Sequence, residues 1–261
     1  MPELPEVETT LRGIEPYIIG KKISSVIIRN PSLRWPVPEE IPKKLKNQVI
    51  DRIQRRGKYL LLQVSKEYLI IHLGMSGSLR ISKQADIKKH DHIDLCFEDG
   101  TYLRYCDPRR FGCLIWTESD PLNHKLITKL GKEPFSDSFT GTYLYERRKS
   151  HHTAIKNFIM NSKIVVGVGN IYACEALNRS KISPTRISNK VTLKECEVLV
   201  NEIKIILAEA IQAGGSTLRD FAGVDGTLGY FPHQFKVYDK EGGDCECGGI
   251  IQRLVQGGRS T

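Results

Sequence analysis

The sequence predicts a multi-domain α+β protein: an antiparallel β-sandwich with a leading helix first, a helical domain second and a short strand pair last. Three observations predict this order. Apolar residues recur with period two in short runs between Lys22 and Glu118. Apolar residues recur at helical spacing from about Leu122 to Ala213. The C-terminal stretch that follows contains two cysteines close together. The expected domains are residues 1–120, 121–230 and 231–261.

Composition narrows the class of protein. The 261 residues are 40% hydrophobic and 26% charged, which excludes a disordered or fibrous chain. A formal charge of +9 favours a polyanionic partner. No apolar run approaches the ~20 residues of a membrane span, and the acidic, proline-punctuated start is unlike a signal peptide. Seven cysteines, an odd and mostly scattered set, fit reduced thiols, so we expect a cytoplasmic protein without a membrane partner.

The first expected element is a helix over Pro5–Ile19. Proline is tolerated in the first helical turn, and Gly20 is a plausible stop. The apolar stripe of this helix consists of Val7, Leu11, Ile14 and Ile18.

Short β-rich runs follow, and Glu98-Asp99-Gly100 between two of them is a strong hairpin signal. The expected strands are Ile23–Ile28, Val49–Ile53, Tyr59–Val64, Tyr68–His72, Ser78–Ile81, Ile93–Phe97, Tyr102–Tyr105 and Gly112–Trp116.

Helices are expected over Thr153–Asn161, Ile171–Asn178 and Thr192–Ala213, the last ending at Gly214-Gly215. Phe231–Thr261 is expected to form a small strand pair that carries Cys245 and Cys247.

The N-terminus carries the most informative motif. Removal of Met1 would leave the secondary amine of Pro2 as the N-terminus. An α-amino group has a pKa of about 7.7–8.0, against about 10.4 for lysine, so far more of it is a neutral nucleophile at pH 7. Glu3 and Glu6 are available for proton transfer or for positioning this amine. The alternative is that these residues only begin a helix.

Two loop motifs combine exposed apolar and basic residues. Met75 stands between two glycines, and Arg109 and Phe111 lie two residues apart, so they project the same way from an extended loop. Such side chains can replace a departed base and stack on its neighbours. The alternatives are a methionine and an aromatic ring packed in the core. Lys58 follows a basic turn that is either a solvated corner or a phosphate contact.

A third motif is the segment Gly167-Val168-Gly169-Asn170. Two glycines before a helix leave backbone N–H groups free to hold a phosphate, and Asn170 could cap that helix.

These motifs together resemble the bacterial formamidopyrimidine-DNA glycosylase family, which removes oxidised purines such as 8-oxoguanine, and the resemblance runs nearly end to end. It is carried by Pro2–Thr9, Arg56–Tyr59, His72–Leu79, Asp107–Gly112, Gly167–Ala173, Gly214–Phe221 and Gly258–Thr261. The family fold implied is a β-sandwich, a helical domain with a helix–two-turns–helix motif and a zinc ribbon. The implied protein is a monomeric bacterial glycosylase and abasic-site lyase that acts on double-stranded DNA and needs no redox cofactor.

The resemblance also implies residue roles. Pro2 would attack the sugar C1′ to form a Schiff base, Glu3 would be the general acid/base, and Lys58 would donate a proton in β-elimination. Arg259 matches the residue of δ-elimination. The implied DNA contacts are His90, Lys156 and Asn170, together with Met75, Arg109 and Phe111, which fill the gap left by the flipped nucleotide. The loop 215–230 corresponds to the segment that closes over the extruded base.

Two departures from the family pattern stand out. His151 and His152 stand where the family often has Lys or Arg, so a DNA contact by His151 would weaken as pH rises from 6 to 8, more steeply than in a His151→Lys variant. Cys245 and Cys247 are the expected zinc ligands, but they form a Cys-x-Cys pair, and the given sequence has no second pair after them. A structural zinc ion is expected only if that pair follows.

Three other functions remain as alternatives. An endonuclease VIII-like enzyme for oxidised pyrimidines would more typically have Gly in place of Leu4. A catalytically silent damage-binding protein would have no use for a free terminal amine. A plain zinc-ribbon nucleic-acid-binding protein would not need the long β domain.

Overall fold

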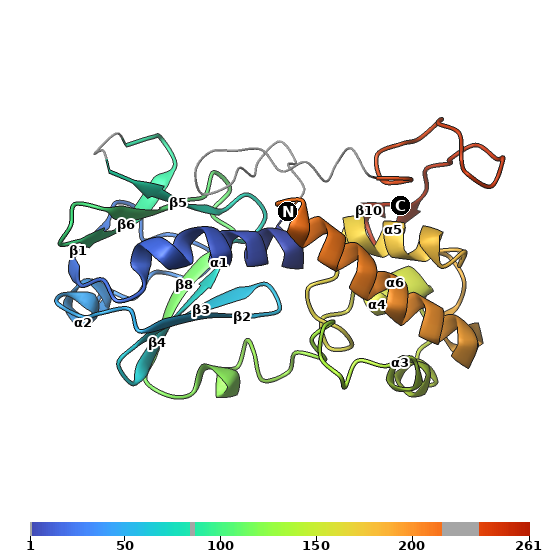
Figure 1. The fold of residues 1–261 in the computed structure, drawn as a ribbon, viewed down its shortest axis with the longest axis horizontal. Helices are drawn as coiled ribbons and strands as arrows, with labels where there is room; N and C mark the ends of the chain where they lie inside the picture. The colour runs from blue at the N-terminus through green and yellow to red at the C-terminus, as the bar shows by residue number, and fades with distance from the viewer. Residues whose placement is uncertain (1, 84–86, 216–234) are drawn as a thin grey trace. The chain divides into compact units, whose positions relative to one another are not determined.

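The computed structural model describes residues 2–83, 87–215 and 235–261, which form two compact units (Figure 1). The first unit comprises Met1–Thr128 and Gly214–Tyr230, and the second comprises Lys129–Ala213 and Phe231–Thr261. The three-domain limits at residues 120 and 230 stay a prediction.

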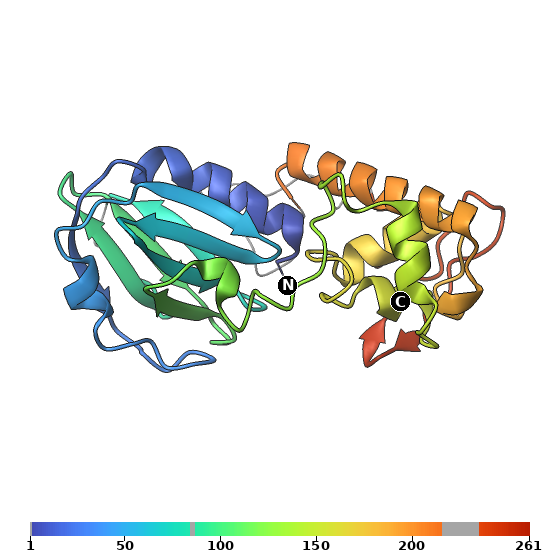
Figure 2. The same ribbon diagram turned by 90° about the horizontal axis from the view of Figure 1, so that it is seen from below.

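The first unit contains two four-stranded antiparallel sheets, which confirms the predicted β-sandwich (Figure 1, Figure 2). Their orders are β1-β6-β7-β5 and β2-β3-β4-β8. The strands are β1 (Ile23–Ile28), β2 (Arg52–Arg56), β3 (Tyr59–Val64), β4 (Glu67–His72), β5 (Ser78–Ser82), β6 (Asp91–Phe97), β7 (Tyr102–Cys106) and β8 (Cys113–Thr117).

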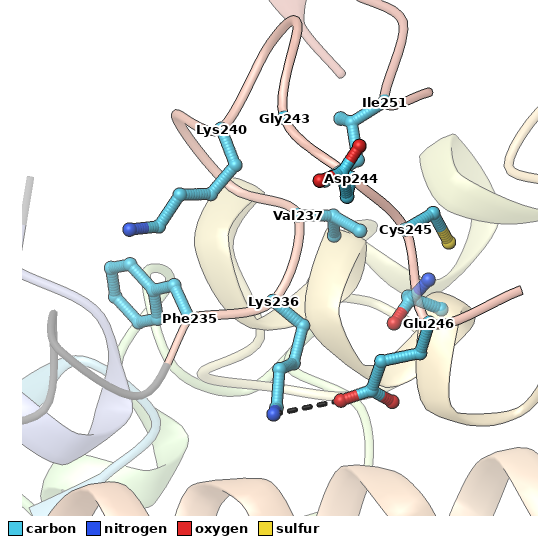
Figure 3. Close-up of a pocket in the computed structure, with 10 residues that line it drawn as sticks. Phe235, Lys236, Val237, Lys240, Gly243, Asp244, Cys245, Glu246 and Ile251 are labelled. Carbon is cyan, nitrogen blue, oxygen red and sulfur yellow. Dashed lines mark ion pairs between the residues drawn. The ribbon is translucent and has the colours of Figure 1, made fainter. Parts of the chain in front are cut away.

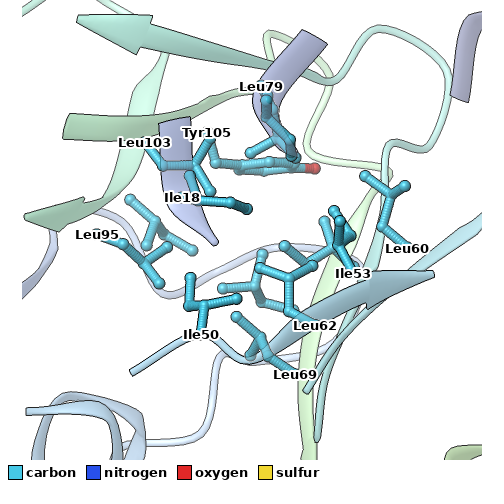
Figure 4. Close-up of a cluster of buried hydrophobic side chains, with 14 of the residues drawn as sticks. Ile18, Ile50, Ile53, Leu60, Leu62, Leu69, Leu79, Leu95, Leu103 and Tyr105 are labelled. Carbon is cyan, nitrogen blue, oxygen red and sulfur yellow. The ribbon is translucent and has the colours of Figure 1, made fainter. Parts of the chain in front are cut away.

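Alternate residues of both sheets meet in one hydrophobic core (Figure 4). Leu60 and Leu62 come from β3, whereas Leu95, Leu103 and Tyr105 come from β6 and β7, and all five are at most 1% exposed. The period-two pattern of the sequence therefore identifies the inward faces.

Helix α1 (Leu4–Ile18) packs against β2, β3 and β5. It begins and ends one residue before the predicted limits, and Gly20, with φ of +72°, follows its end as expected. The whole predicted stripe of four apolar residues is buried in the sandwich core.

Two elements of this unit depart from the prediction. Strand β2 covers Arg52–Arg56 rather than Val49–Ile53, because its pairing with β3 continues through polar residues to the turn at Gly57. Helix α2 (Ile41–Leu45) was not predicted, since five residues are too few to show a helical period. A short 3-10 helix, η1 (Pro121–Asn123), follows the sandwich.

The second unit is helical, as predicted. Its helices are α3 (Gly141–Arg148), α4 (Ile155–Ile159), α5 (Asn170–Arg179), the 3-10 helix η2 (Ser188–Lys190) and α6 (Leu193–Gln212). Helix α6 packs against α3 and α5 and begins with a capping box between Thr192 and Glu195. Helix α3 was not predicted, because Leu144 is its one large apolar side chain that is buried.

The C-terminal strand pair lies after the cysteines, not around them. It consists of β9 (Val255–Gln256) and β10 (Arg259–Ser260). Cys245 and Cys247 lie in a tight turn closed by a single bridge between Asp244 and Ile250. The predicted C-terminal strand pair is therefore confirmed, but the expectation that its strands carry the cysteines was wrong, because both cysteines lie in the preceding turn, where Gly248 has φ of +86°.

None of the described helices combines the length and the apolar character needed to cross a bilayer.

Candidate functional site

The start of α1 holds Pro2, Glu3 and Glu6. Pro2 and Glu3 are buried, and Glu3 occupies the N-cap position of the helix. The Glu3 backbone N–H donates to Glu6 Oε2 at 2.8 Å, so the Glu6 carboxylate secures the first turn. Gly215, with φ of +82°, lies against Glu6, since a Cβ there would be 3.4 Å from Glu6 Oε1. The Glu3 carboxylate is therefore placed by the helix itself, one residue after Pro2.

Lys58 lies half-buried on the turn between β2 and β3, directly after Gly57, whose φ is +59°. Arg55 ties this turn to α1: its Nε donates to Glu8 Oε2 at 2.8 Å, and its Nη1 donates to the Gly57 carbonyl oxygen at 3.0 Å. Burial opposes ionisation of Glu8, but the bonded Arg55 guanidinium outweighs it and holds the pKa of that carboxyl below its usual range. The Lys58 turn is thus anchored to the helix that begins at the N-terminus.

His72 ends β4 opposite Tyr59, with the ring centroids 4.7 Å apart. The Gly74 N–H donates to its Nδ1 at 2.9 Å. Burial, and then the nearby cations Lys58 and Arg34, lower the pKa of the imidazole to about 4, so the ring is neutral at pH 7. A neutral ring whose Nδ1 accepts carries its proton on Nε2, which makes His72 a hydrogen-bond donor beside Lys58.

Met75, Arg109 and Phe111 lie on two loops that pack together. Met75 is 36% exposed and Phe111 is 43% exposed, which excludes the alternatives in which they fill the core. The Arg109 guanidinium carbon lies 4.7 Å from the Phe111 ring centroid, so these two side chains project together. Where the loops meet, a Cβ on Gly74 would lie 2.4 Å from the Gly112 nitrogen.

His90 adjoins the same two loops. Its carbonyl oxygen accepts the Asp107 N–H at 3.1 Å, and its ring lies 6.3 Å from that of His92. Asp107 begins the loop that carries Arg109 and Phe111. A backbone bond therefore links His90 to the loop that carries Arg109 and Phe111.

In the second unit, Lys156 and Asn170 converge on the carbonyl oxygen of Ser260. Lys156 is 0% exposed, and its Nζ donates to that oxygen at 3.1 Å and to Thr261 Oγ1. The Asn170 Nδ2 donates to the same oxygen at 2.8 Å. Asn170 does not cap α5, as the sequence analysis had suggested. Gly169 is the N-cap, and Asn170 is the first helical residue.

Arg259 is exposed on β10, after a turn made by Gly257 and Gly258. Both glycines have positive φ, at +56° and +73°, as a two-residue hairpin turn of type I′ requires. Gln256 Nε2 donates to the Pro184 carbonyl oxygen at 3.2 Å and adds a further anchor. The position of Arg259 is therefore set by a hairpin that is tied to the helical unit.

A buried carboxylate that the sequence analysis missed anchors the chain leading to this hairpin. Glu175 is 0% exposed and accepts three successive backbone N–H groups, from Lys236 (2.9 Å), Val237 (3.0 Å) and Tyr238 (2.7 Å). A sequence signal was present, because Glu175 is the single acidic residue in an otherwise apolar stretch of α5.

His151 lies half-buried just before α4. Its Nδ1 is 2.9 Å from the Arg147 carbonyl oxygen, and its ring packs 5.0 Å from that of Phe158. Nδ1 must therefore donate, which leaves Nε2 as the acceptor atom of the neutral ring. The next residue, His152, is exposed beside Asn189.

The two C-terminal cysteines do not complete a metal site. Cys245 lies on the wall of a cavity of about 360 Å³, where Glu246 pairs with Lys236 at 2.8 Å (Figure 3). A hydrogen bond with Cys245 lowers the pKa of the Cys247 thiol. No group of three or more His, Cys, Asp or Glu among the described residues could hold a metal ion, whereas a structural zinc site needs four ligands.

Comparison with known proteins accounts for nearly the whole chain. Residues 1–114 match the formamidopyrimidine-DNA glycosylase N-terminal domain, and residues 130–222 match the formamidopyrimidine-DNA glycosylase H2TH domain. Two similar sequences are the formamidopyrimidine-DNA glycosylases of Thioalkalivibrio sulfidiphilus, 49% identical, and Cellvibrio japonicus, 50% identical. Each alignment covers 100% of this chain and 97% of the relative.

Solved structures are also similar to this chain over its whole length. The MutM (Fpg) protein of Thermus thermophilus superposes with a TM-score of 0.89 at 35% identity and covers 100% of this chain and 96% of its own. A Lactococcus lactis Fpg mutant in complex with a Fapy-dG containing DNA superposes with a TM-score of 0.92 at 36% identity, covering 100% and 97%.

Proposed function

Because the chain belongs to the formamidopyrimidine-DNA glycosylase family, we propose that it excises oxidised purines from double-stranded DNA and then cleaves the strand at the abasic site. Its substrates are 8-oxoguanine and ring-opened formamidopyrimidines. The observation that carries the mechanism is the start of α1, where buried Glu3 caps the helix one residue after Pro2.

The Pro2 amine is the nucleophile once Met1 is removed. It lies at the N-terminal end of a 15-residue helix, whose partial positive charge disfavours an ammonium there and so favours the neutral amine. Attack on the sugar C1′ displaces the base, which leaves with the electron pair of the glycosidic bond and takes up a proton. The C1′–O4′ bond then opens, O4′ takes a proton, and a positively charged iminium ion joins Pro2 to C1′. The iminium ion makes the C2′ proton acidic, so the same intermediate leads to strand cleavage.

Glu3 and Lys58 move the protons. Glu3 is adjacent to the nucleophile, and its burial strengthens its interaction with charge that develops there. Lys58 donates during β-elimination from a turn that Arg55 holds. Arg259 assists δ-elimination from the C-terminal hairpin.

Three exposed side chains form a wedge that enters the DNA: Met75, Arg109 and Phe111. Taking a nucleotide out of the stack costs a few kcal/mol, and apolar and aromatic side chains that fill the gap offset part of it. Their exposure is typical of groups that bury themselves in DNA.

The DNA backbone is held by donors in both units. In the first unit these are His90 and the neutral His72, which can bond a phosphate oxygen through Nε2. In the second unit the contacts are Asn170 and His151, while buried Lys156 acts through the hairpin. Duplex DNA as substrate places the reaction with the chromosome in the bacterial cytoplasm.

The described residues provide only some of the ligands of a structural zinc site. The family pattern implies a structural ion, but the described residues offer two thiols of the four ligands such a site needs. The hairpin that carries Arg259 is held instead by Lys156 and Asn170, so no catalytic step is assigned to a metal.

The test is a comparison of lesions in otherwise identical duplexes. The protein should excise 8-oxoguanine opposite cytosine much faster than an oxidised pyrimidine such as 5-hydroxycytosine. The reverse preference would identify an endonuclease VIII-like enzyme. Tight binding to both lesions with no excision would identify a damage-binding protein.

A further inference from the structure

We propose that Asp107 is the positioning residue of the wedge: its buried carboxylate joins the loop of Met75 to the loop of Arg109 and Phe111, so that the three side chains enter DNA as one unit. The proposal rests on the proposed function, because it assumes that the wedge opens the base stack.

The Asp107 carboxylate accepts four hydrogen bonds and is 0% exposed. Its Oδ1 accepts from Ser76 Oγ at 2.8 Å and from the Arg109 N–H at 3.3 Å. Its Oδ2 accepts from the Gly112 N–H at 2.9 Å and from the Tyr105 hydroxyl at 3.0 Å. Each oxygen thus binds one hydroxyl and one backbone N–H.

Three of these four donors belong to the loops of the wedge. Arg109 itself is a wedge residue, Gly112 follows Phe111, and Ser76 follows Met75. Ser76 Oγ also accepts the Arg109 N–H at 3.2 Å, which closes a small ring of bonds between the loops.

The Asp107 main chain is fixed as well. Its N–H donates to the His90 carbonyl oxygen at 3.1 Å, and its own carbonyl oxygen bonds His92 Nε2 at 2.8 Å and accepts the Arg110 N–H at 3.2 Å. Burial, and then the nearby Asp107 carboxylate, raise the pKa of the Tyr105 hydroxyl, which keeps that group a donor. The carboxylate therefore cannot move without breaking bonds at both ends of the loop.

The two loops pack closely where their backbones meet. A Cβ on Gly74 would lie 2.4 Å from the Phe111 carbonyl carbon, and a Cβ on Gly112 would lie 1.9 Å from the Tyr105 hydroxyl oxygen. Met75 and Phe111 therefore stand on loops that are already in contact before DNA binds. A preorganised wedge spends less binding free energy on ordering its own side chains.

The variant Asp107→Asn is designed to release one loop anchor. An asparagine side chain has a single acceptor oxygen, so in either orientation one of the two backbone N–H groups, of Arg109 or of Gly112, faces an NH₂ group. The hydroxyls of Ser76 and Tyr105 can rotate to accept, whereas a backbone N–H cannot.

The experiment compares two substrates under single-turnover conditions. Asp107→Asn should excise 8-oxoguanine about 10- to 100-fold more slowly than the wild type, since the N–H of Arg109 or of Gly112 loses its bond to the side chain of residue 107 and the wedge that must open the stack is held less firmly. Cleavage at a preformed abasic site, where no base has to leave the stack, should stay within about threefold. A 2-aminopurine base beside the lesion should show less fluorescence increase on binding.

Asp94→Asn is the matched control. It also removes a fully buried carboxylate, one bonded to Arg104 at 2.8 Å and Arg29 at 2.6 Å in the sheet of β1 and β6. It should lower Tm and leave the ratio of the two rates unchanged.

Ser76→Ala serves as a second variant if Asp107→Asn does not fold, and it should slow excision about 3- to 10-fold. Equal slowing on both substrates, or no slowing on either, would overturn the role of Asp107. If the wild type does not excise 8-oxoguanine, the proposed function fails, and the 2-aminopurine signal still tests Asp107 through binding alone.

Discussion

A single backbone hydrogen bond determines the tautomer of His72. The Gly74 N–H occupies Nδ1, and burial with two nearby cations keeps the ring neutral, so its one proton stays on Nε2 and faces outward from that contact. A neutral donor binds a phosphate oxygen without needing acid conditions. His72 is thus suited to a repair enzyme that works near pH 7.

We predict that a His72→Asn variant loses part of the acid sensitivity of the fold. The folded-state pKa of His72, about 4, lies below the ordinary 6.5, so the unfolded chain takes up the proton first as pH falls. The stability tied to the neutral ring is complete above pH 6.5 and is lost towards pH 4. Urea unfolding at pH 7 and pH 4.5 should show a drop about 2–3 kcal/mol larger in the wild type than in the variant. Equal drops, or an NMR titration of the ring near 6.5, would contradict the assignment.

The Glu8–Arg55 pair holds the turn that carries Lys58. We predict that Glu8→Gln slows abasic-site cleavage about tenfold, because Arg55 then loses its charged anchor and the turn of Lys58 loosens. Glu15→Gln is the control, since Glu15 is exposed on the same helix. Single-turnover rates on abasic DNA provide the measurement. If both variants match the wild type, the pair does not position Lys58.

The limits of a helix or strand can be predicted from the sequence where apolar residues recur with one period along the whole element. Helix α1 and strand β3 lie within one residue of their predicted limits, because each buries an unbroken stripe of apolar side chains in the sandwich core. The limits of β2 depend instead on pairing with β3 through Arg55 and Arg56, which a polarity pattern does not show. Helices α2 and α3 are too short or too polar to carry a period.

The same limit applies to the site. The sequence identifies candidates that stand next to each other in the chain, such as Pro2 with Glu3 or Arg109 with Phe111. It misses Glu175, whose backbone partners lie 61 to 63 positions away, because tertiary hydrogen bonds have no sequence period. The burial of Lys156 under the C-terminal hairpin was missed for the same reason.

Hydrogen bonds from Lys156 and Asn170 hold the C-terminal hairpin. Lys156→Met should remove one of two donors to the Ser260 carbonyl and let the hairpin open more often. The δ-elimination product should then fall relative to the β-elimination product, because Arg259 is no longer held in place. Gel analysis of the strand ends measures this ratio. Lys194→Met, at an exposed position on α6, should leave it unchanged, and an unchanged ratio in Lys156→Met would refute the role.

At the scale of the whole molecule, stability comes from packing and hydrogen bonds rather than from covalent links. All seven cysteines are free thiols, and the sandwich core and the helical unit each bury their own apolar side chains. The C-terminal segment is tied to the helical unit by Glu175, Lys156 and Asn170.

Attack of the Pro2 amine on the DNA can be detected by borohydride trapping. The mature protein and a form with one extra residue before Pro2 are each incubated with a duplex that carries 8-oxoguanine opposite cytosine, in the presence of borohydride. A covalent protein–DNA adduct should form with the mature form alone and map to Pro2 by mass spectrometry. An adduct of equal yield from the extended form, or one mapped to a lysine, would contradict it.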